Sequence, residues 1–503
     1  MRFTVKMKNE NFSPQLLFFF LGISVTVLFY CFSDGISGND FWWHIKAGEW
    51  IVENGRVPDT DIFSWIGKER ELSWTAHEWL SEVIFYIVYA LCGETGIYLM
   101  SLFCAVFMVI FLFWTARDNM RRNFLLGGSF FIFLAVTESS FFYGRPHIFS
   151  FFLLAAELKI LYGFYENPKD RKIYLLPFLA SLWSNLHGGS SNLSYLLCFL
   201  FLGISVLHFQ CGRVRAERMS RSGIKRLAVV SAFTMGAVAL NPFGMRMLVY
   251  PYTNMLDDFM LSVISEWQAP DVKNAGALLF YFLPIVLMSI GFFTEKRDIR
   301  LLDVIMMGFF LYLFFRSVRF IMLWYIAAPF YAFPYLPEMK NGEIRKHTEK
   351  IAVCVCGIIL LLLMENSIYL IGRTLNGGEV ISTVVSEKMI EAIQQDQPQR
   401  LFNDYNTGET LIYHDVEVFI DSRADVYSTE HILEDAFSLL FLQQRSEETE
   451  EEIVDVEALM GKYQFDALLV LKSRPLYVYL LSHPEEFTLI SEDEEMGYFR
   501  VKG

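Results

Sequence analysis

The stretch "GNDFWWHIKAGEWI", residues 38–51, places titratable side chains among aromatic rings, directly after an apolar run that ends near Cys31. Asp40 and His44 stand beside one phenylalanine and three tryptophans. Tryptophan is enriched at membrane–water interfaces, but a carboxylate gains nothing by packing against rings. The stretch therefore predicts a polar, functional loop at the edge of a membrane-embedded fold, and the topology of that fold has to be worked out first.

Composition predicts an integral membrane protein with an acidic soluble domain. Of the 503 residues, 54% are hydrophobic, 17% aromatic and only 19% charged, proportions typical of membrane proteins. From residue 373 onward there are 10 Lys+Arg and 27 Asp+Glu, a net charge of −17; the first 372 residues hold the remaining 32 and 29, a net charge of +3. We therefore predict a transmembrane domain at 1–372, with a large first outer loop at 34–94, and a soluble domain at 373–503.

Eleven apolar runs are candidates for transmembrane helices, which need about 20 apolar residues each. They lie near 16–33, 95–116, 124–141, 148–165, 174–186, 193–209, 227–241, 278–294, 301–315, 321–337 and 351–372. A cleaved signal peptide is the alternative for the first run, but no small-x-small cleavage site is evident, so we interpret it as a retained span. The run at 77–93 carries acids at 78 and 82 and is interpreted as a helix lying at the membrane interface. The predicted fold class is a polytopic α-helical membrane protein of about 11 transmembrane helices with an extracytoplasmic α/β domain.

The basic residues predict the orientation of these helices. Alternate connections are rich in Lys and Arg: "RDNMRRN", "NPKDRK", "CGRVRAERMSRSGIKR", "EKRDIR" and "KNGEIRKHTEK". Such connections stay in the cytoplasm, as does the basic N-terminus. The other connections, at 34–94, 142–147, 187–192, 242–277 and 316–320, and the tail are then outside the cytoplasmic membrane.

The tail reads as a small α/β unit. Strand-like runs at 400–404, 416–421, 467–472 and 487–491 alternate with helical stretches at 383–396, 428–444, 451–463 and 475–483. This alternation predicts a short, mostly parallel sheet with helices on its faces. Asp421, Arg423 and Asp425 follow the second run, where α/β sheets bind ligands, and a strand-end salt-bridge cluster is the alternative. The tail has no cysteine for a disulfide, and its acidic charge argues against nucleic acid as a partner.

Polar side chains gather on the predicted outer face. The outer connections and the adjoining helix ends hold Asp40, His44, Asp61, His77, Glu78, Arg145, His147, Asn185, His187, Asn241, Glu266 and Arg319. Titratable groups at membrane depth usually line a polar cavity, so their convergence from separate segments predicts one site. For any single residue the alternatives are structural: an interfacial histidine, an arginine that reaches the headgroups, or a tryptophan of an aromatic belt.

The motifs in these segments resemble a known superfamily. "NDFWWHIKAGEWIVENGRVPDTDIFSW" and "SWTAHEWLSEVIFY" resemble the first outer loop of bacterial multi-span proteins of the GT-C glycosyltransferase superfamily, relatives of protein O-mannosyltransferases and aminoarabinose lipid A transferases. "RPHIFSF", "WSNLHGG", "LNPFG", "SEWQAPD" and the tail's "FNDYNTGETLIYHDVEVFIDSRADVY" are similar to further motifs of one such branch.

The resemblance implies a polyprenyl-phosphate-linked sugar donor, transfer on the outer side of the membrane and a catalytic carboxylate in the first outer loop. Asp40 is the matching position. The better-known mannosyltransferases carry two adjacent acids there, whereas residue 39 is Asn in this chain. This departure leaves the acceptor class and any metal requirement open.

The chemistry of such a transfer assigns roles to the outer-face residues. An acceptor hydroxyl needs a base, and Asp40 is the candidate, with His44 one helical turn later to orient it. Negative charge on the departing phosphate needs cations or N–H donors. The candidates for the phosphate are Arg145, His147, His187 and Arg319, and those for the acceptor pocket are Asp61, His77, Glu78, Asn185 and Glu266. No metal-ligand motif such as HExxH is present, so no metal ligand is assigned, and a divalent metal stays open as a cofactor.

Two other functions fit the composition: a transporter or flippase for a lipid-linked glycan, and a non-catalytic partner in envelope assembly. Transporters commonly have related halves and ionisable residues near mid-span. Here the halves show no mutual similarity and the ionisable residues gather at one face. We therefore expect a glycosyltransferase whose partners are a polyprenyl-phosphate sugar, membrane lipids and an unidentified acceptor.

Overall fold

The computed structural model describes residues 14–32, 40–255, 258–338, 383–444 and 452–502, with scattered helical positions between 351 and 372. The chain divides into two compact units. The first comprises Met1–Ile36, Cys92–Met255 and Leu261–Val380, and the second comprises Ser37–Leu91, Leu256–Met260 and Ile381–Gly503. The segment predicted as the first outer loop of the membrane domain thus folds with the tail. The predicted boundary at residue 373 lies outside the described residues.

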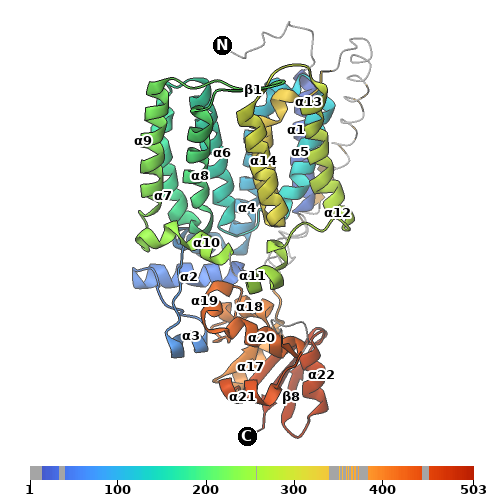
Figure 1. Cartoon of the computed structure of the whole chain (residues 1–503). Coiled ribbons are helices and arrows are strands. Elements are labelled where there is room, and N and C mark those ends of the chain that lie inside the picture. Colours follow the sequence, from blue (N-terminus) through green and yellow to red (C-terminus); the bar gives the residue numbers. More distant parts are fainter. Residues whose placement is uncertain are drawn as a thin grey trace. The chain divides into compact units, whose positions relative to one another are not determined.

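The first unit is built from apolar helices that run side by side (Figure 1). They are α1 (Pro14–Cys31), the later part of α4 (Trp79–Met120), α5 (Phe124–Ser139), α6 (His147–Glu166), α7 (Leu176–Leu186), α8 (Asn192–Ser205), α9 (Arg221–Val238), α13 (Leu283–Thr294), α14 (Leu301–Arg316) and α15 (Ile321–Tyr331). Polar side chains cap the N-termini of α5 and α9. The Asn123 side chain accepts a hydrogen bond from Leu126 N, and the Ser220 side chain accepts one from Gly223 N.

Short helices connect these longer ones. They are η1 (Arg171–Leu175), η2 (Gly188–Ser190), η3 (Gly244–Leu248), α10 (Tyr250–Met255), α11 (Asp258–Val263), η4 (Ser265–Trp267), α12 (Ala275–Ala277), η5 (Leu278–Phe282), η6 (Val318–Phe320) and η7 (Phe333–Tyr335).

Helices occupy the first ten of the eleven predicted spans, and the eleventh, 351–372, lies largely outside the described residues. Among the described residues, four helices are long and apolar enough to cross a membrane: Trp79–Met120, His147–Glu166, Gly188–Ser205 and Ala275–Thr294. Several others are apolar but shorter, so the predicted count of eleven is not confirmed. The run at 77–93 forms the first part of α4 and ends at a kink, where Gly93 has φ 60° and ψ −159°.

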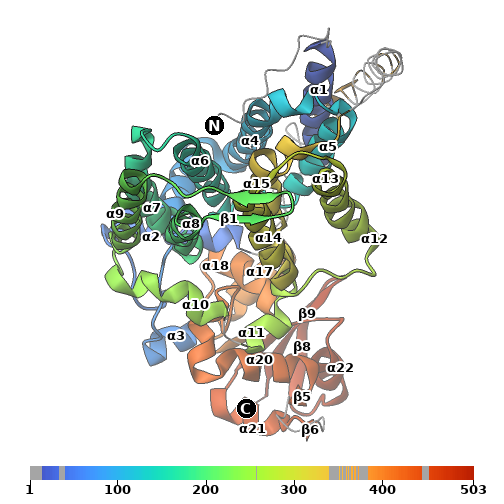
Figure 2. The same ribbon diagram turned by 45° about the horizontal axis from the view of Figure 1, so that its top comes forward.

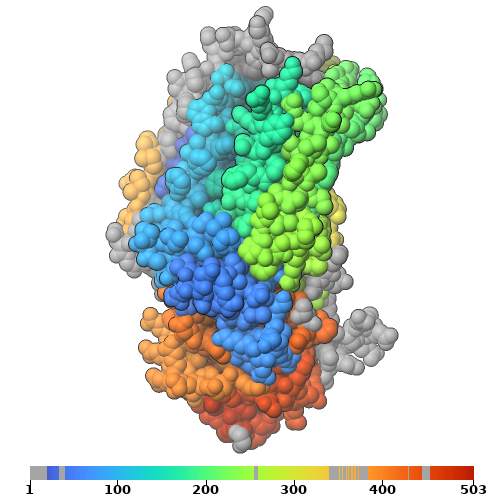
Figure 3. All heavy atoms as spheres, turned by 90° about the vertical axis from the view of Figure 1, so that its left-hand side faces the viewer, coloured from blue at the N-terminus to red at the C-terminus, as the bar shows by residue number. Residues whose placement is uncertain are grey.

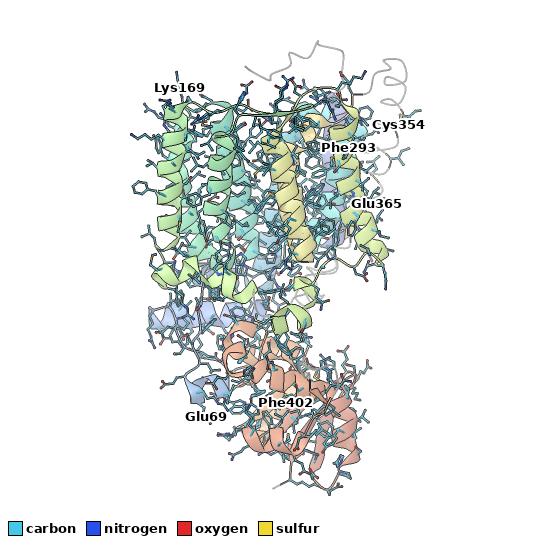
Figure 4. All side chains as sticks on the ribbon, viewed as in Figure 1. Glu69, Lys169, Phe293, Cys354, Glu365 and Phe402 are labelled. Carbon is cyan, nitrogen blue, oxygen red and sulfur yellow. The ribbon has the colours of Figure 1, made fainter. Side chains whose placement is uncertain are left out.

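Contacts place the connections of the first unit at two opposite ends. At one end Arg300 pairs with Glu166, and a small sheet joins β1 (Phe209–Cys211), β2 (Val214–Ala216) and β3 (Ile299–Arg300), as Figure 2 shows. Lys169 and Phe293 lie at this end (Figure 4). At the other end Val318 N donates to Gln268 O. Within the first unit, the described Lys/Arg-rich connections thus share one end, and the predicted outer connections that belong to this unit share the other.

The second unit contains a four-stranded sheet that is mainly antiparallel, so the prediction of a mostly parallel sheet was wrong. The strand order is β4-β7-β9-β8, and only β4 (Leu401–Asn403) and β7 (Ala467–Leu471) are parallel. β9 (Met496–Val501) pairs antiparallel with β7 and with β8 (Phe487–Glu492), and a tight turn joins β8 to β9. A separate two-stranded ladder joins β5 (Gln443–Gln444) and β6 (Glu452–Ile453).

Helices surround this sheet. They are α17 (Glu387–Asp396), η8 (Tyr405–Thr407), α18 (Gly408–Tyr413), α19 (Ala424–Tyr427), η9 (Ser428–Glu430), α20 (Ile432–Phe441), α21 (Val456–Tyr463) and α22 (Pro475–Ser482). Helices α17, α20, α21 and α22 lie close to the four predicted helical stretches, and the shorter helices between 405 and 427 were not predicted.

The predicted strand at 416–421 is not a strand, for a physical reason. The Asn403 side chain accepts from Phe419 N at 2.8 Å and donates to Ile420 O at 2.8 Å. A side chain thereby takes the backbone groups that a neighbouring strand would use. The segment forms only an isolated bridge, Ser64 with Val418.

The first-loop segment supplies part of the core of the second unit. Its helices are α2 (Phe41–Asn54), α3 (Trp65–Arg70) and the start of α4. Trp65 Nε1 donates to Leu401 O at 3.0 Å, and the Trp65 ring lies 5.6 Å from that of Phe419. The Trp42 ring lies 4.1 Å from that of Tyr413. In Figure 3 the blue atoms of this segment lie directly against the orange atoms of the tail, and Figure 4 shows Glu69 of α3 and Phe402 of β4 in this unit. Trp42 and Trp65 are therefore buried core residues, not members of an exposed belt.

Candidate functional site

Asp40 and His44 lie at the start of α2. Asp40 is the N-cap residue and is half-buried, and His44 N donates to Asp40 O at 3.3 Å, so the two residues are one helical turn apart. The His44 ring is buried and lies 3.7 Å from the Trp43 ring. The helical register thus brings the candidate base and the candidate orienting group to one helix end.

Two carboxylates flank the His44 ring. His44 Nε2 lies 3.8 Å from Glu78 Oε2, and His44 Nδ1 lies 3.5 Å from Glu82 Oε1. His77 is at the edge of the group, with Nδ1 3.9 Å from Glu78 Oε1. Sequence reasoning did not select Glu82, although its i,i+4 spacing from Glu78 places both on one helix face and was a signal available in the sequence.

A second group in the same unit is centred on Arg423. Its Nη2 lies 2.8 Å from Asp61 Oδ1 and 2.6 Å from Asp421 Oδ2, and Tyr427 donates to Asp421 Oδ2 at 2.6 Å. Its guanidinium carbon lies 4.6 Å from the centre of the Trp74 ring. Burial by itself would lower the pKa of Arg423, but the carboxylates of Asp421 and Asp61 raise it well above the ordinary value.

The sequence allowed two interpretations of the tail residues Asp421, Arg423 and Asp425: a ligand site or a strand-end salt-bridge cluster. Arg423 contacts the carboxylates of both Asp61 and Asp421, and all three side chains are buried. Asp425 is half-buried, in the first turn of α19. The geometry therefore favours a salt-bridge cluster at this position over a ligand site.

The first unit has its own charged group at the end that carries the predicted outer connections. Arg145 Nη1 lies 3.2 Å from Glu266 Oε2, and the Arg319 guanidinium lies 5.3 Å from the centre of the Trp267 ring. Burial raises the pKa of Glu266, but Arg319 and Arg145 outweigh it, and the pKa is lowered from 4.5. His147 interacts with the same charges, and its Nε2 contacts Phe141 O. Arg145, His147, Glu266 and Arg319 come from three connections and form one group.

His187 and Asn185 make contacts that connect helices of the first unit. The Ser150 hydroxyl lies 2.6 Å from His187 Nδ1 and accepts from Trp183 Nε1 at 2.7 Å. Asn185 Nδ2 donates to Leu240 O at 2.8 Å. Ser150 lies one turn after His147 on α6, so the His187 contact bears on the helix start that presents His147.

Comparisons with known proteins add to this geometry. No protein-family model matches the sequence, and no curated protein matches it. Among solved structures, the apo oligosaccharyltransferase of Archaeoglobus fulgidus matches with a TM-score of 0.54 and 13% identity, over 91% of this chain and 69% of that one. The chain has a GT-C fold.

Two further structures of that archaeal protein share the GT-C fold with this chain. The form tethered to an acceptor peptide with the NVT sequon matches with a TM-score of 0.53 and 11% identity, over 92% of this chain and 69% of that one. The complex with an inhibitory peptide and a dolichol-phosphate matches with a TM-score of 0.53 and 12% identity, over 91% and 69%. The GT-C fold extends over nearly the whole chain.

Proposed function

We propose that this GT-C protein is a membrane glycosyltransferase that moves a sugar from a polyprenyl-phosphate-linked donor to an acceptor hydroxyl on the outer face of the cytoplasmic membrane. The observation that carries the proposal is the group of Arg145 and Arg319 around the single carboxylate of Glu266. Both guanidiniums act on this carboxylate, at the end of a helix bundle whose fold is shared with a protein solved with dolichol-phosphate.

Two guanidiniums in one group suit a phosphate that becomes a leaving group. When the bond between the anomeric carbon and the phosphate oxygen breaks, its electron pair moves to the phosphate. Arginine stabilises such an oxyanion through charge-assisted hydrogen bonds. We assign this role to Arg145 and Arg319, aided by His147, and we assign to His187 the positioning of the first turns of α6 through Ser150. Glu266 and Asn185 stay candidates for the acceptor pocket.

Asp40 is proposed as the general base. Its carboxylate would accept the proton of the acceptor hydroxyl while that oxygen bonds to the anomeric carbon. It is half-buried at the start of α2, where the adjacent helix keeps it in place. We assign a positioning role to His44, one turn later, and we propose that His77 and Glu78 contribute to the acceptor pocket. We propose that Asp61, through its ion pair with Arg423, stabilises the conformation of the first-loop segment that contributes to the acceptor pocket.

The base assignment is tested with Asp40→Asn, assayed in membranes with a labelled polyprenyl-phosphate sugar. A positioned base typically contributes about 10²–10⁴-fold to rate, and the variant should lose transfer by that factor at unchanged expression. Glu53→Gln is the matched control, because Glu53 is an exposed acid on the same helix. Equal transfer by Asp40→Asn and Glu53→Gln would remove Asp40 from the mechanism.

The phosphate assignment is tested with Arg145→Ala and Arg319→Ala. Each should raise the donor concentration needed for half-maximal rate by about tenfold or more, with a smaller change for the acceptor, because a charged hydrogen bond contributes about 1.5–3 kcal/mol. Arg316→Ala is the control, since Arg316 is exposed at the end of α14, three residues before Arg319. Unchanged donor dependence in both variants would contradict this role.

A further inference from the structure

The group of His44, Glu78 and Glu82 has the composition and spacing of a metal site. One ring nitrogen of His44 and one oxygen of each carboxylate lie within 4.8 Å of one another. The two measured nitrogen–oxygen distances, 3.5 and 3.8 Å, are longer than hydrogen bonds of about 2.7–3.2 Å. They run from the two different ring nitrogens of His44, and a single ion would bind only one of these nitrogens together with the two carboxylates.

Glu82 provides the second, independent observation. Its side chain is only 1% exposed, and neither of its carboxylate oxygens has a hydrogen-bond partner among the described residues. Buried carboxylates are normally hydrogen-bonded, paired or bound to a metal. The charge of Arg423 acts on Glu82, but this arginine already contacts Asp61 and Asp421 directly. Glu82 therefore presents buried carboxylate oxygens that accept no hydrogen bond from the described residues, one of them 3.5 Å from His44 Nδ1.

The backbone holds the three side chains in fixed positions. Glu78 and Glu82 are four residues apart at the start of α4, so they project from one face of the helix. Across from them, α2 approaches α4 closely at Gly48, where a Cβ atom would lie 2.1 Å from Glu82 O. The ring of Trp43 lies along one side of His44, and that of Phe85 is 6.2 Å away. A preformed set of ligands on two helices is the condition for specific metal binding.

We propose that His44, Glu78 and Glu82 bind a divalent transition-metal ion of the zinc or manganese class. One imidazole and two carboxylates are ligands that such ions accept, whereas Ca²⁺ and Mg²⁺ prefer oxygen alone. The ion would neutralise the two carboxylates and tie α2, which begins after Asp40, to α4. This inference concerns binding and does not depend on the proposed glycosyl transfer.

The test uses the full-length protein in detergent, stripped with a chelator and then equilibrated with Zn²⁺ or Mn²⁺. Elemental analysis after desalting should find about one ion per chain in the wild type, and chelation should lower its melting temperature. Glu82→Gln, Glu78→Gln and His44→Asn should each weaken binding by at least tenfold and should melt at a temperature that chelation does not change. Glu53→Gln, on the exposed end of α2, should bind like the wild type.

Glu78→Gln keeps the test decisive if the more buried variants do not fold, because the Glu78 side chain is 15% exposed and its amide replacement has the same shape. Absence of Zn²⁺ and Mn²⁺ from the wild type would overturn the proposal. So would binding by Glu78→Gln equal to that of the wild type, or a preference for Mg²⁺ or Ca²⁺ over both transition metals.

Discussion

At the scale of single residues, the charges of this protein are arranged in small local groups whose balance differs. Arg423 contacts the carboxylates of Asp61 and Asp421 directly and is enclosed by rings, so its own charge is compensated inside the protein. Arg145 and Arg319 both act on the carboxylate of Glu266. Glu78 and Glu82 flank the ring of His44 at distances longer than hydrogen bonds. We assign an anion to the group of two arginines and a cation to the group of two glutamates.

Removal of Arg423 from its buried group should destabilise the protein strongly. Arg423→Ala leaves Asp61 and Asp421 buried without their counter-charge, and breaking a buried pair in this way typically costs about 3–5 kcal/mol. The measurement is thermal unfolding or limited proteolysis of the full chain in detergent.

A surface ion pair between the same two segments provides the control for Arg423. Arg70 Nη1 lies 2.6 Å from Glu430 Oε2, with both side chains partly exposed. Solvent-exposed pairs contribute about 0–1 kcal/mol, so Arg70→Ala should change stability little. If the two variants unfolded at the same temperature, burial of the Arg423 group would have no energetic consequence.

At the scale of helices and strands, local pattern predicted the helices well and the sheet poorly. Apolar runs lie within single segments, and α5, α6 and α14 lie within one or two residues of the predicted ranges. The sheet depends on partners outside each strand. The segment 416–421 has a strand-like sequence, but the Asn403 side chain takes its backbone groups, and β9 was missed although it pairs with two strands.

The site was predictable to the same extent. Sorting the connections by their basic residues predicted that Arg145, Glu266 and Arg319 share one face, and in the structure these three side chains interact. The pairing of the first loop with the tail had no local signal, because Asp61 and Arg423 are separated by most of the chain. Glu82 was noted only as an acid of an interface helix, and its contact with His44 depends on how α2 packs against α4.

The close approach of α2 and α4 gives a prediction at this scale. In Gly48→Ala the new methyl group would meet Glu82 O at 2.1 Å and Tyr86 Cβ at 2.7 Å, so the helices must separate. Overpacking of this kind typically costs about 1–3 kcal/mol, and we expect a lower melting temperature in detergent.

Gly236→Ala is the control, since Gly236 lies inside α9 with no atom within 4 Å of the added methyl group. Alanine is favoured over glycine within a helix by roughly 0.5–1 kcal/mol, so this variant should be at least as stable as the wild type. A Gly48→Ala protein as stable as Gly236→Ala would mean that the contact between α2 and α4 is loose, and would also weaken the case for a preformed metal site.

At the scale of the whole molecule, the second unit is assembled from segments that are far apart in the sequence, mainly 37–91 and 381–503. Most of the first unit lies between them in the sequence. The segments 37–91 and 381–503 must be on the same side of the membrane, because hydrogen bonds and ion pairs join one segment to the other. This is a physical constraint on topology that is independent of the distribution of Lys and Arg.

Both arguments predict the same orientation for a set of reporter fusions in a bacterial membrane. A phosphatase that is active only outside the cytoplasm should be active when fused after Gly503 or inserted near Asp59, an exposed residue of the first-loop segment. The same reporter near Lys169, in a basic connection at the opposite end of α6 from Arg145, should be inactive. If only one of the fusions at Asp59 and Gly503 were active, the two segments could not fold together in the second unit. If only the fusion at Lys169 were active, the predicted membrane orientation would be wrong, and the Arg145 group would not be on the outer face.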